Sequence, residues 1–230
     1  MSSDGLKTEY GVKWKAIPNY YKQSRTELSG FIHVGENSVL DIGCAAGYLG
    51  ESLKKSEKAK IVYGIEGFEE AAREAEKRLD VVFLGDLESL DFSKLNSEWE
   101  GKLFDYLIFG DVLEHLRDPW SVLQASKCML KDDGEILISL PNIRHWSVLL
   151  PLIIKGSWKY TAQGILDKTH FRFFTKSSAC DLVKSCGLDI TYAGVPVNGR
   201  RSNMISKLSF GMLNEFLGIQ LLISCKKSSK

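Results

Sequence analysis

Short apolar runs alternate along this chain with longer segments in which apolar residues recur at helical spacing. Five of the runs predict buried strands, at 38–42, 61–65, 81–83, 104–109 and 134–140. The longer segments predict helices at 18–30, 48–58, 68–79 and 118–131. Because strands separated by helices favour parallel pairing with right-handed crossovers, this part of the chain predicts an α/β sheet with helices on its faces.

The last part of the chain adds one helix and two more strands. Thr175 predicts the cap of a helix that stops at Gly187, and residues 188–193 and 218–225 predict a final strand pair. The tail at 226–230 is predicted to be disordered. The expected fold is therefore a doubly wound, mostly parallel seven-stranded sheet with a C-terminal antiparallel strand pair.

Composition narrows the class of protein. At 230 residues the chain predicts a single domain, 1–230, with one substantial core. Lysine and arginine (30) nearly cancel aspartate and glutamate (29), so the net charge of +1 disfavours a nucleic-acid partner. The five cysteines include no C-x-x-C pair, which favours reduced structural thiols over disulfides or zinc ligands. Since there is neither a signal-peptide pattern nor an apolar run of roughly 20 residues, we expect a cytoplasmic protein.

The segment 39–50 carries the strongest chemical signal, because an apolar strand breaks there into a glycine turn and then a helix. Gly43 and Gly47 allow the backbone to approach a ligand, and the carboxylate of Asp41 can organise the loop amides or a bound amine. A dinucleotide fingerprint needs G-x-G-x-x-G, but the second and third glycines are replaced by Ala45 and Tyr48. A P-loop also fails, since no Gly-Lys-Ser/Thr follows.

The remaining pattern, D-x-G-x-A-x-G, resembles the first motif of class I S-adenosylmethionine-dependent methyltransferases, which is usually D/E-x-G-x-G-x-G. Ala45 departs from that motif by one methyl group. The resemblance implies a Rossmann-like fold and S-adenosylmethionine as cofactor. It also implies that the cofactor lies against the loop, at Asp41, Gly43, Cys44, Ala45 and Gly47.

Further cofactor residues are expected where the next strands end, because ligands of such sheets bind outside the carboxyl ends of the strands. Glu66, about 20 residues past the loop, is placed to accept both hydroxyls of a ribose. By resemblance, Asp86 would bond the adenine amine and Leu87 would offer a backbone amide to the ring. Gly110 and Asp111 would lie near the methionine portion of the cofactor.

Two more stretches bear on the acceptor. The run 104–119 resembles the fourth-strand region of methyltransferases that act on small molecules and sugars, and it lacks the D/N-P-P-Y/F and Pro-Cys motifs of nucleic-acid enzymes. Residues 140–146 and 167–175 resemble bacterial methyltransferases associated with cell-surface polysaccharide and O-antigen synthesis. The resemblance spans 18–225. It implies O-methylation of a sugar, with N-methylation of a small molecule or amino sugar left open.

Histidines are the candidate catalytic residues, because a hydroxyl acceptor must lose a proton as it is methylated. His115 follows the fourth strand. Alternation over 168–173 would turn His170 toward the acceptor, with Phe171 and Phe173 inward. Each histidine could instead be a structural residue whose ring is hydrogen-bonded near a loop.

Three further residues are candidates for the site and have other expected roles. His33 lies before the first strand, on the wrong edge, and His145 would form a pocket wall. Glu114 either orients one of the catalytic histidines or is a helix-start charge, and the second reading is favoured. No histidine–carboxylate spacing resembles a metal site, so no metal is predicted.

The domain then divides into a helix at 18–30, a cofactor-binding core at 38–140, an acceptor insertion at 141–174 and a C-terminal helix with its strand pair at 175–225. Within the insertion, 146–160 is apolar and aromatic, which predicts a lid or a peripheral membrane contact. A polyprenyl-linked sugar would fit the membrane alternative. Two other functions stay open: a nucleotide-dependent oxidoreductase, disfavoured by the missing fingerprint, and a non-catalytic domain that binds the cofactor or a partner.

Overall fold

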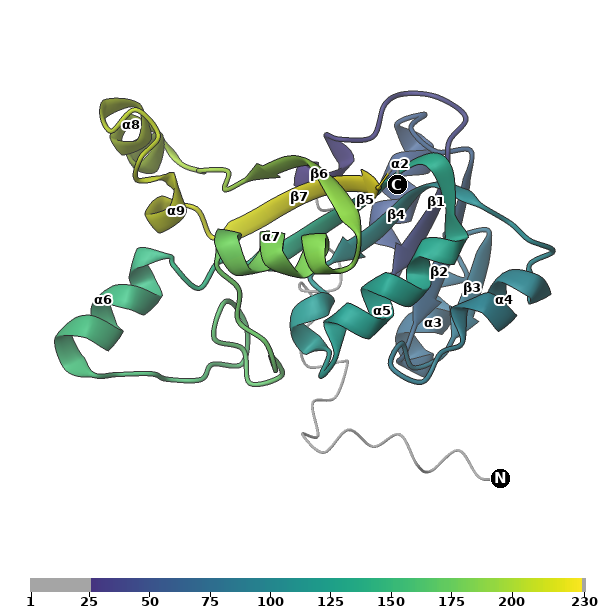
Figure 1. The fold of residues 1–230 in the computed structure, drawn as a ribbon, viewed down its shortest axis with the longest axis horizontal. Coiled ribbons are helices and arrows are strands. Elements are labelled where there is room, and N and C mark those ends of the chain that lie inside the picture. Colours follow the sequence, from purple (N-terminus) through teal and green to yellow (C-terminus); the bar gives the residue numbers. More distant parts are fainter. Residues whose placement is uncertain (1–25, 229–230) are drawn as a thin grey trace.

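The computed structural model describes residues 26–228 and contains one seven-stranded sheet in the order β3-β2-β1-β4-β5-β7-β6 (Figure 1). The first five strands pair in parallel, and β7 pairs antiparallel with both β5 and β6. The predicted fold class is confirmed. The strands are β1 Ser38–Ile42, β2 Ile61–Glu66, β3 Val81–Leu84, β4 Phe104–Gly110, β5 Leu130–Pro141, β6 Leu188–Gly194 and β7 Gln220–Lys227.

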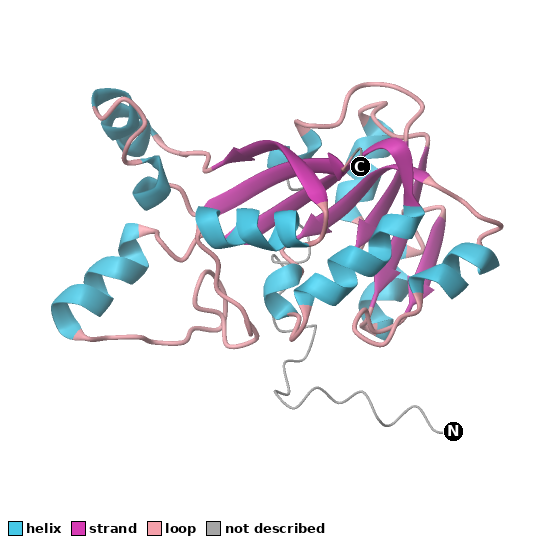
Figure 2. Ribbon diagram, in the orientation of Figure 1, coloured by secondary structure: helices cyan, strands magenta, loops and turns pink. Residues whose placement is uncertain are grey.

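Helices connect the strands, and several of them cover the faces of the sheet (Figure 2). They are α1 Thr26–Ser29, α2 Tyr48–Lys55, α3 Glu69–Ala75, α4 Phe92–Glu98, α5 Pro119–Ser126, α6 Trp146–Lys155, α7 Lys176–Ser185, α8 Arg200–Leu208 and α9 Asn214–Leu217, with 3₁₀ turns η4 Leu113–His115 and η5 Lys127–Met129. Several predicted helices end early, since 118–131 divides into α5 and η5. Of the predicted helix at 18–30, residues 18–25 lie outside the described part of the chain.

The two faces of the sheet carry separate apolar cores. On one face Leu28 of α1, Leu53 of α2 and Ala75 of α3 pack together. The larger core on the other face includes side chains from α4, α5 and α7, among them Phe92 and Leu123. Strand β1 is buried along its whole length because helices cover it on both sides, as expected for a central parallel strand.

Local capping explains where several helices begin. The side chain of Asp118 accepts a hydrogen bond from Ser121 N, and Pro119 occupies the first turn of α5, as the sequence predicts. Thr175 caps α7 in a reciprocal capping box with Ser178. The sequence reading missed the short helix α4, although Asp91 caps it with bonds from two backbone amides.

The C-terminal strand lies two residues later than predicted, at 220–227 instead of 218–225. Lys226 and Lys227 belong to β7 and pair with β6, so the prediction of a disordered tail from residue 226 is wrong for these two residues. Pro141 and Gln220 are opposite each other, which places the start of β7 at the sheet edge where the parallel strands end. Between residues 26 and 228, no helix is both long and apolar enough to cross a membrane.

Helices α6, α8 and α9 stand away from the sheet at one end of the molecule, on the left in Figure 1. Large apolar side chains of these helices and their loops are exposed, with 75% of Ile153 in α6 accessible to solvent, and 94% of Phe210 and 81% of Met212 in the loop between α8 and α9. An ion pair between Arg144 and Glu215 joins the start of α6 to α9. We call the surface formed by α6, α8, α9 and their loops the apolar end.

Candidate functional site

The loop between β1 and α2 takes the tight course that the sequence predicts. Gly43 and Gly47 both have a φ of 77°, in the left-handed region that favours glycine. A side chain at Gly43 would meet Val112, because a Cβ atom there would lie 2.4 Å from Val112 Cγ2. The amides of Gly43 and Cys44 both donate to Ile65 O, at 2.8 and 3.1 Å. The loop is therefore fastened between the end of β2 and the segment after β4.

Ala45 occupies the one loop position that departs from the glycine pattern. Its φ of 48° is also left-handed, a conformation that costs an L-residue roughly 1–2 kcal/mol. The methyl group is therefore accommodated with strain, at a place where glycine would have none. The strain lies in the cofactor loop itself, which is typical of functional sites.

The variant Ala45→Gly is expected to raise the free energy of unfolding by about 0.5 kcal/mol. Relief of the left-handed strain exceeds the extra flexibility that glycine gives the unfolded chain. Urea denaturation measures the change. The matched control, Ala46→Gly, changes a buried neighbour whose φ is negative and should destabilise the protein. An Ala45→Gly protein that is less stable than the natural chain would contradict the assigned strain.

Glu66 lies at the end of β2 and holds the loop through its carboxylate. Oε2 accepts a hydrogen bond from Ala45 N at 2.8 Å, and Oε1 accepts one from Phe68 N at 2.9 Å. Burial raises the pKa of Glu66, and these backbone amides oppose the rise. Each carboxylate oxygen can accept two hydrogen bonds, so both oxygens of Glu66 can still accept the predicted bonds from ribose hydroxyls.

Asp41 and Cys44 line the buried base of the loop. Asp41 lies inside β1, opposite Gly64 of β2 and Ile108 of β4, rather than at the very end of the strand. Burial raises the pKa of the Cys44 thiol well above its ordinary value, and the nearby charges of Asp41 and Glu66 raise it further. Cys44 is therefore a neutral, buried thiol.

Asp86 and Leu87 follow β3 at the same sheet edge. Asp86 is exposed, and its Oδ1 accepts a hydrogen bond from Glu88 N at 3.2 Å. Leu87 is half-buried against the main core. The exposed carboxylate of Asp86, next to the half-buried Leu87, suits the expected adenine contacts. Those contacts remain a prediction.

Asp111 connects the ends of three strands. It follows Gly110, the last residue of β4, and has a φ of 53°. Its Oδ1 accepts hydrogen bonds from Ser139 Oγ at 2.9 Å and from Gln220 Nε2. Its own amide donates to Ser139. Sequence reasoning missed Ser139 and Gln220, because only the strand order brings β5 and β7 beside this turn.

The two predicted catalytic histidines meet in the structure. The ring centroids of His115, in η4, and His170 lie 4.7 Å apart in a T-shaped contact. The amides of Phe171 and Arg172 donate to Glu114 O at 2.8 and 3.0 Å, which fastens the 165–172 segment onto η4. The predicted alternation is wrong, because this segment is not a strand: His170 is buried and Phe171 is exposed.

Burial holds both histidine rings in the neutral form. Burial, with a further contribution from His170, lowers the pKa of His115 to about 4, and burial also lowers the pKa of His170. Nδ1 of His115 lies 3.2 Å from Thr169 O, and Nδ1 of His170 lies 3.1 Å from Ile165 O. A neutral ring that donates to a carbonyl through Nδ1 carries its lone pair on Nε2, so these contacts assign the tautomer.

The neighbouring candidates have other roles. Glu114 lies in the first turn of η4, as the favoured helix-start interpretation expects, and is 1% exposed beside the histidines. His145 caps α6, since its Nδ1 accepts a hydrogen bond from Ser147 N at 3.3 Å. Burial lowers the pKa of His145. His33 is exposed, away from the ligand edge.

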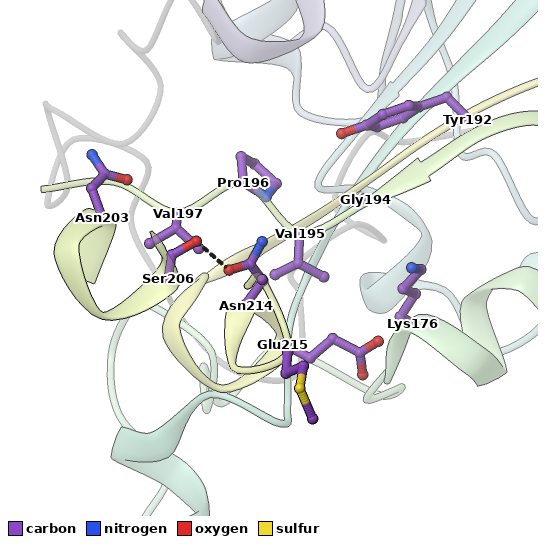
Figure 3. A pocket seen from close by; sticks show the side chains of 12 residues that line it. Lys176, Tyr192, Gly194, Val195, Pro196, Val197, Asn203, Ser206, Asn214 and Glu215 are labelled. Carbon is purple, nitrogen blue, oxygen red and sulfur yellow. Dashed lines mark hydrogen bonds between the residues drawn. The ribbon is translucent and has the colours of Figure 1, made fainter. Parts of the chain in front are cut away.

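A pocket of about 530 Å³ opens between the end of β6 and the helices α8 and α9 (Figure 3). Its lining is mainly polar and includes Lys176, Asn203 and Glu215. Ser206 Oγ donates to Asn214 Oδ1 at 2.6 Å across its wall. The pocket lies at the sheet edge where the parallel strands end, and no local sequence pattern indicates it.

The geometry agrees with a comparison against protein families, in which a model described as a methyltransferase domain matches residues 14–193. The chain belongs to this methyltransferase domain family. It is a class I S-adenosylmethionine-dependent methyltransferase, as its sequence predicts, and S-adenosylmethionine is its cofactor. Glu66 at the end of β2 and Asp86 after β3 place carboxylates on the edge where that cofactor is expected.

Curated relatives of this methyltransferase include two ubiquinone biosynthesis O-methyltransferases. The enzyme of Glaesserella parasuis is 33% identical over 153 residues, which cover 64% of this chain and 62% of the relative. The enzyme of Burkholderia thailandensis is 27% identical over 210 residues, which cover 87% of this chain and 83% of the relative. The predicted methyltransferase class is confirmed, whereas these names do not include the predicted polysaccharide setting.

Solved methyltransferases have the same fold. A S-adenosylmethionine-dependent methyltransferase of Archaeoglobus fulgidus aligns with a TM-score of 0.61 at 17% identity, covering 92% of this chain and 97% of that one. Magnesium protoporphyrin IX methyltransferase of Synechocystis, solved with bound S-adenosylmethionine, aligns with a TM-score of 0.54 at 14% identity, covering 91% and 80%.

Proposed function

We propose that this enzyme methylates a hydroxyl oxygen of a small molecule, with His115 and His170 as its catalytic residues. The observation that carries the proposal is the contact between two neutral imidazoles, the half-buried His115 of η4 and the buried His170. Asp111 lies close enough for its charge to act on both rings. A hydroxyl must lose a proton during attack, whereas a free amine attacks through its own lone pair, so a basic pair favours oxygen over nitrogen.

The cofactor supplies an electrophilic methyl group on a sulfonium. We propose that Asp41, the loop and Glu66 hold its polar groups, that Asp86 and Leu87 receive the adenine, and that Gly110 and Asp111 face the methionine portion. Val112, the residue before η4, lies directly against Gly43, so the cofactor loop is next to the segment that carries His115. This proximity would align the acceptor with the methyl group, and alignment supplies much of the rate of such displacements.

For the acceptor we favour an aromatic hydroxyl on a lipid-bearing molecule. The curated relatives are named for ubiquinone biosynthesis, and the apolar end suits an acceptor with a lipid tail. A sugar hydroxyl is the second candidate, because the pocket beside β6 offers the amide of Asn203 and the hydroxyl of Ser206. The buried free thiol of Cys44 agrees with a reducing, cytoplasmic setting.

Titration with S-adenosylhomocysteine, with NADH as the matched control, tests the cofactor assignment. Saturable binding of the first and none of the second is expected, and the opposite result would favour an oxidoreductase. A panel of polyprenylated phenols, polyprenyl-linked sugars and amines then tests the acceptor. Turnover of amines alone would overturn the oxygen assignment. Cofactor binding with no turnover of any acceptor would favour a non-catalytic domain.

We also propose that the apolar end contacts a membrane surface. Exposed Lys155, Lys159 and Arg200 flank its apolar side chains, an arrangement that suits anionic headgroups. The protein should therefore sediment with vesicles that contain phosphatidylglycerol, and less with neutral vesicles. The double variant Ile153→Asp, Ile154→Asp should reduce the bound fraction about tenfold or more, because two charges would enter the interface.

The matched control for vesicle binding is Val34→Asp, which places a charge at an exposed apolar residue outside the apolar end. It should bind vesicles like the natural chain. Equal vesicle binding by the double variant and the natural chain would contradict the membrane contact and favour a lid role for α6.

A further inference from the structure

Three side chains converge where η4 meets the 165–172 segment. One potential ligand atom from each of Glu114, His115 and His170 lies within 4.8 Å of the other two. Glu114 and His170 are buried, and His115 is half-buried. Two imidazole nitrogens and one carboxylate oxygen form a common ligand set for zinc, iron and related divalent transition metals.

The surroundings of the histidines match those of metal ligands. A metal-binding histidine usually donates its second ring nitrogen to a carbonyl or carboxylate, which fixes the ring and leaves the other nitrogen for the metal. His115 and His170 each place Nδ1 on a backbone carbonyl, of Thr169 and Ile165 respectively. Both lone pairs are therefore on Nε2.

An outer layer of hydrogen bonds supports His115. Thr169 Oγ1 lies 3.1 Å from Nδ1 of His115 and donates to Asp167 Oδ1 at 2.8 Å. Since this hydroxyl gives its proton to Asp167, it accepts from the ring, which reinforces the same tautomer. The amide of Thr169 also donates to Asp167 Oδ1 at 2.8 Å. A chain of this kind, from carboxylate to histidine, is typical of outer-shell support in metal sites.

We propose that Glu114, His115 and His170 bind one divalent transition-metal ion, with positions left for an acceptor oxygen. This inference rests on the proposed O-methylation and deepens it. A hydroxyl bound to such an ion would release its proton to water more readily. Its oxygen would then take the methyl group, while the electron pair of the broken carbon–sulfur bond stays on sulfur.

Titration of the EDTA-treated full-length protein with Co²⁺, followed by visible absorption, tests the site. One equivalent should bind with a d–d spectrum of nitrogen and oxygen ligands, Zn²⁺ should displace it, and Mg²⁺ should not. His170→Gln and Glu114→Gln should each weaken Co²⁺ binding about 100-fold or more. Thr169→Val, which alters only the outer layer, should weaken it about tenfold.

His33→Gln is the matched control, because it removes an exposed histidine outside the cluster, and it should bind Co²⁺ like the natural chain. Circular dichroism and S-adenosylhomocysteine affinity show that each variant is folded. Equal Co²⁺ affinity in His170→Gln, no saturable binding by the natural chain, or a thiolate charge-transfer band would each overturn the proposal. If methyl transfer persists in EDTA while the metal titration fails, the histidines act directly as bases and only the metal site is lost.

Discussion

Replacement of Glu66 by alanine should weaken the binding of S-adenosylhomocysteine about 100-fold. The variant loses the carboxylate that is expected to accept both ribose hydroxyls, and a hydrogen bond to a charged group contributes roughly 1.5–3 kcal/mol. It also releases the amide of Ala45, which Glu66 holds at 2.8 Å, so the glycine loop loses its link to β2. Calorimetric titration measures the change in affinity directly.

Glu66→Gln separates the two effects, because the amide keeps one acceptor oxygen and the shape of the side chain. It should fall between alanine and the natural residue. Glu69→Ala is the matched control, because it removes an exposed carboxylate at the start of α3 that forms an ion pair with Arg73 on the same helix. If Glu66→Ala bound S-adenosylhomocysteine within a factor of two of the natural chain, the assignment of Glu66 to the cofactor site would be wrong.

The variant His170→Ala should lower kcat about 1,000-fold and leave the affinity for S-adenosylhomocysteine unchanged. General-base catalysis typically contributes 10²–10⁴-fold, and loss of a metal ligand would have an effect of similar or larger size. The ring of His170 contacts His115 rather than the glycine loop, so cofactor binding should be spared. Steady-state assays with an acceptor found in the panel give kcat, and calorimetry gives the affinity.

His33→Ala should behave like the natural chain in both assays, since His33 is exposed before β1. An unchanged kcat in His170→Ala would show that the buried pair is structural. A parallel loss of kcat and cofactor affinity would instead place His170 in the cofactor pocket.

The sheet and the cofactor edge were predictable because both follow from local patterns. Alternating strands and helices restrict the topology to a parallel sheet, and parallel strands end on one edge, which places Gly43, Glu66, Asp86 and Asp111 together. The strained backbone of Ala45 was not foreseen, because a glycine pattern shows which residue is missing but not what φ the substitute adopts.

The cluster around Glu114 depends on a long-range contact that no local pattern records. The 165–172 segment docks onto η4 through two amides that donate to Glu114 O, and this docking buries His170. The alternation expected for a strand failed there, because turns and single bridges replace a ladder. Glu114 and His115, taken together with His170, were the sequence signal that could have predicted this cluster.

The position of β7 has a consequence for the order in which the protein is completed. Strand β6 pairs only with β7 in this sheet, so it has no partner during synthesis until residues 220–227 have emerged. The five parallel strands need no residue beyond Pro141. Gln220, which bonds to Asp111, arrives with β7. The cofactor edge can therefore assemble on a nascent chain, whereas the turn that holds Asp111 is finished among the last steps of folding.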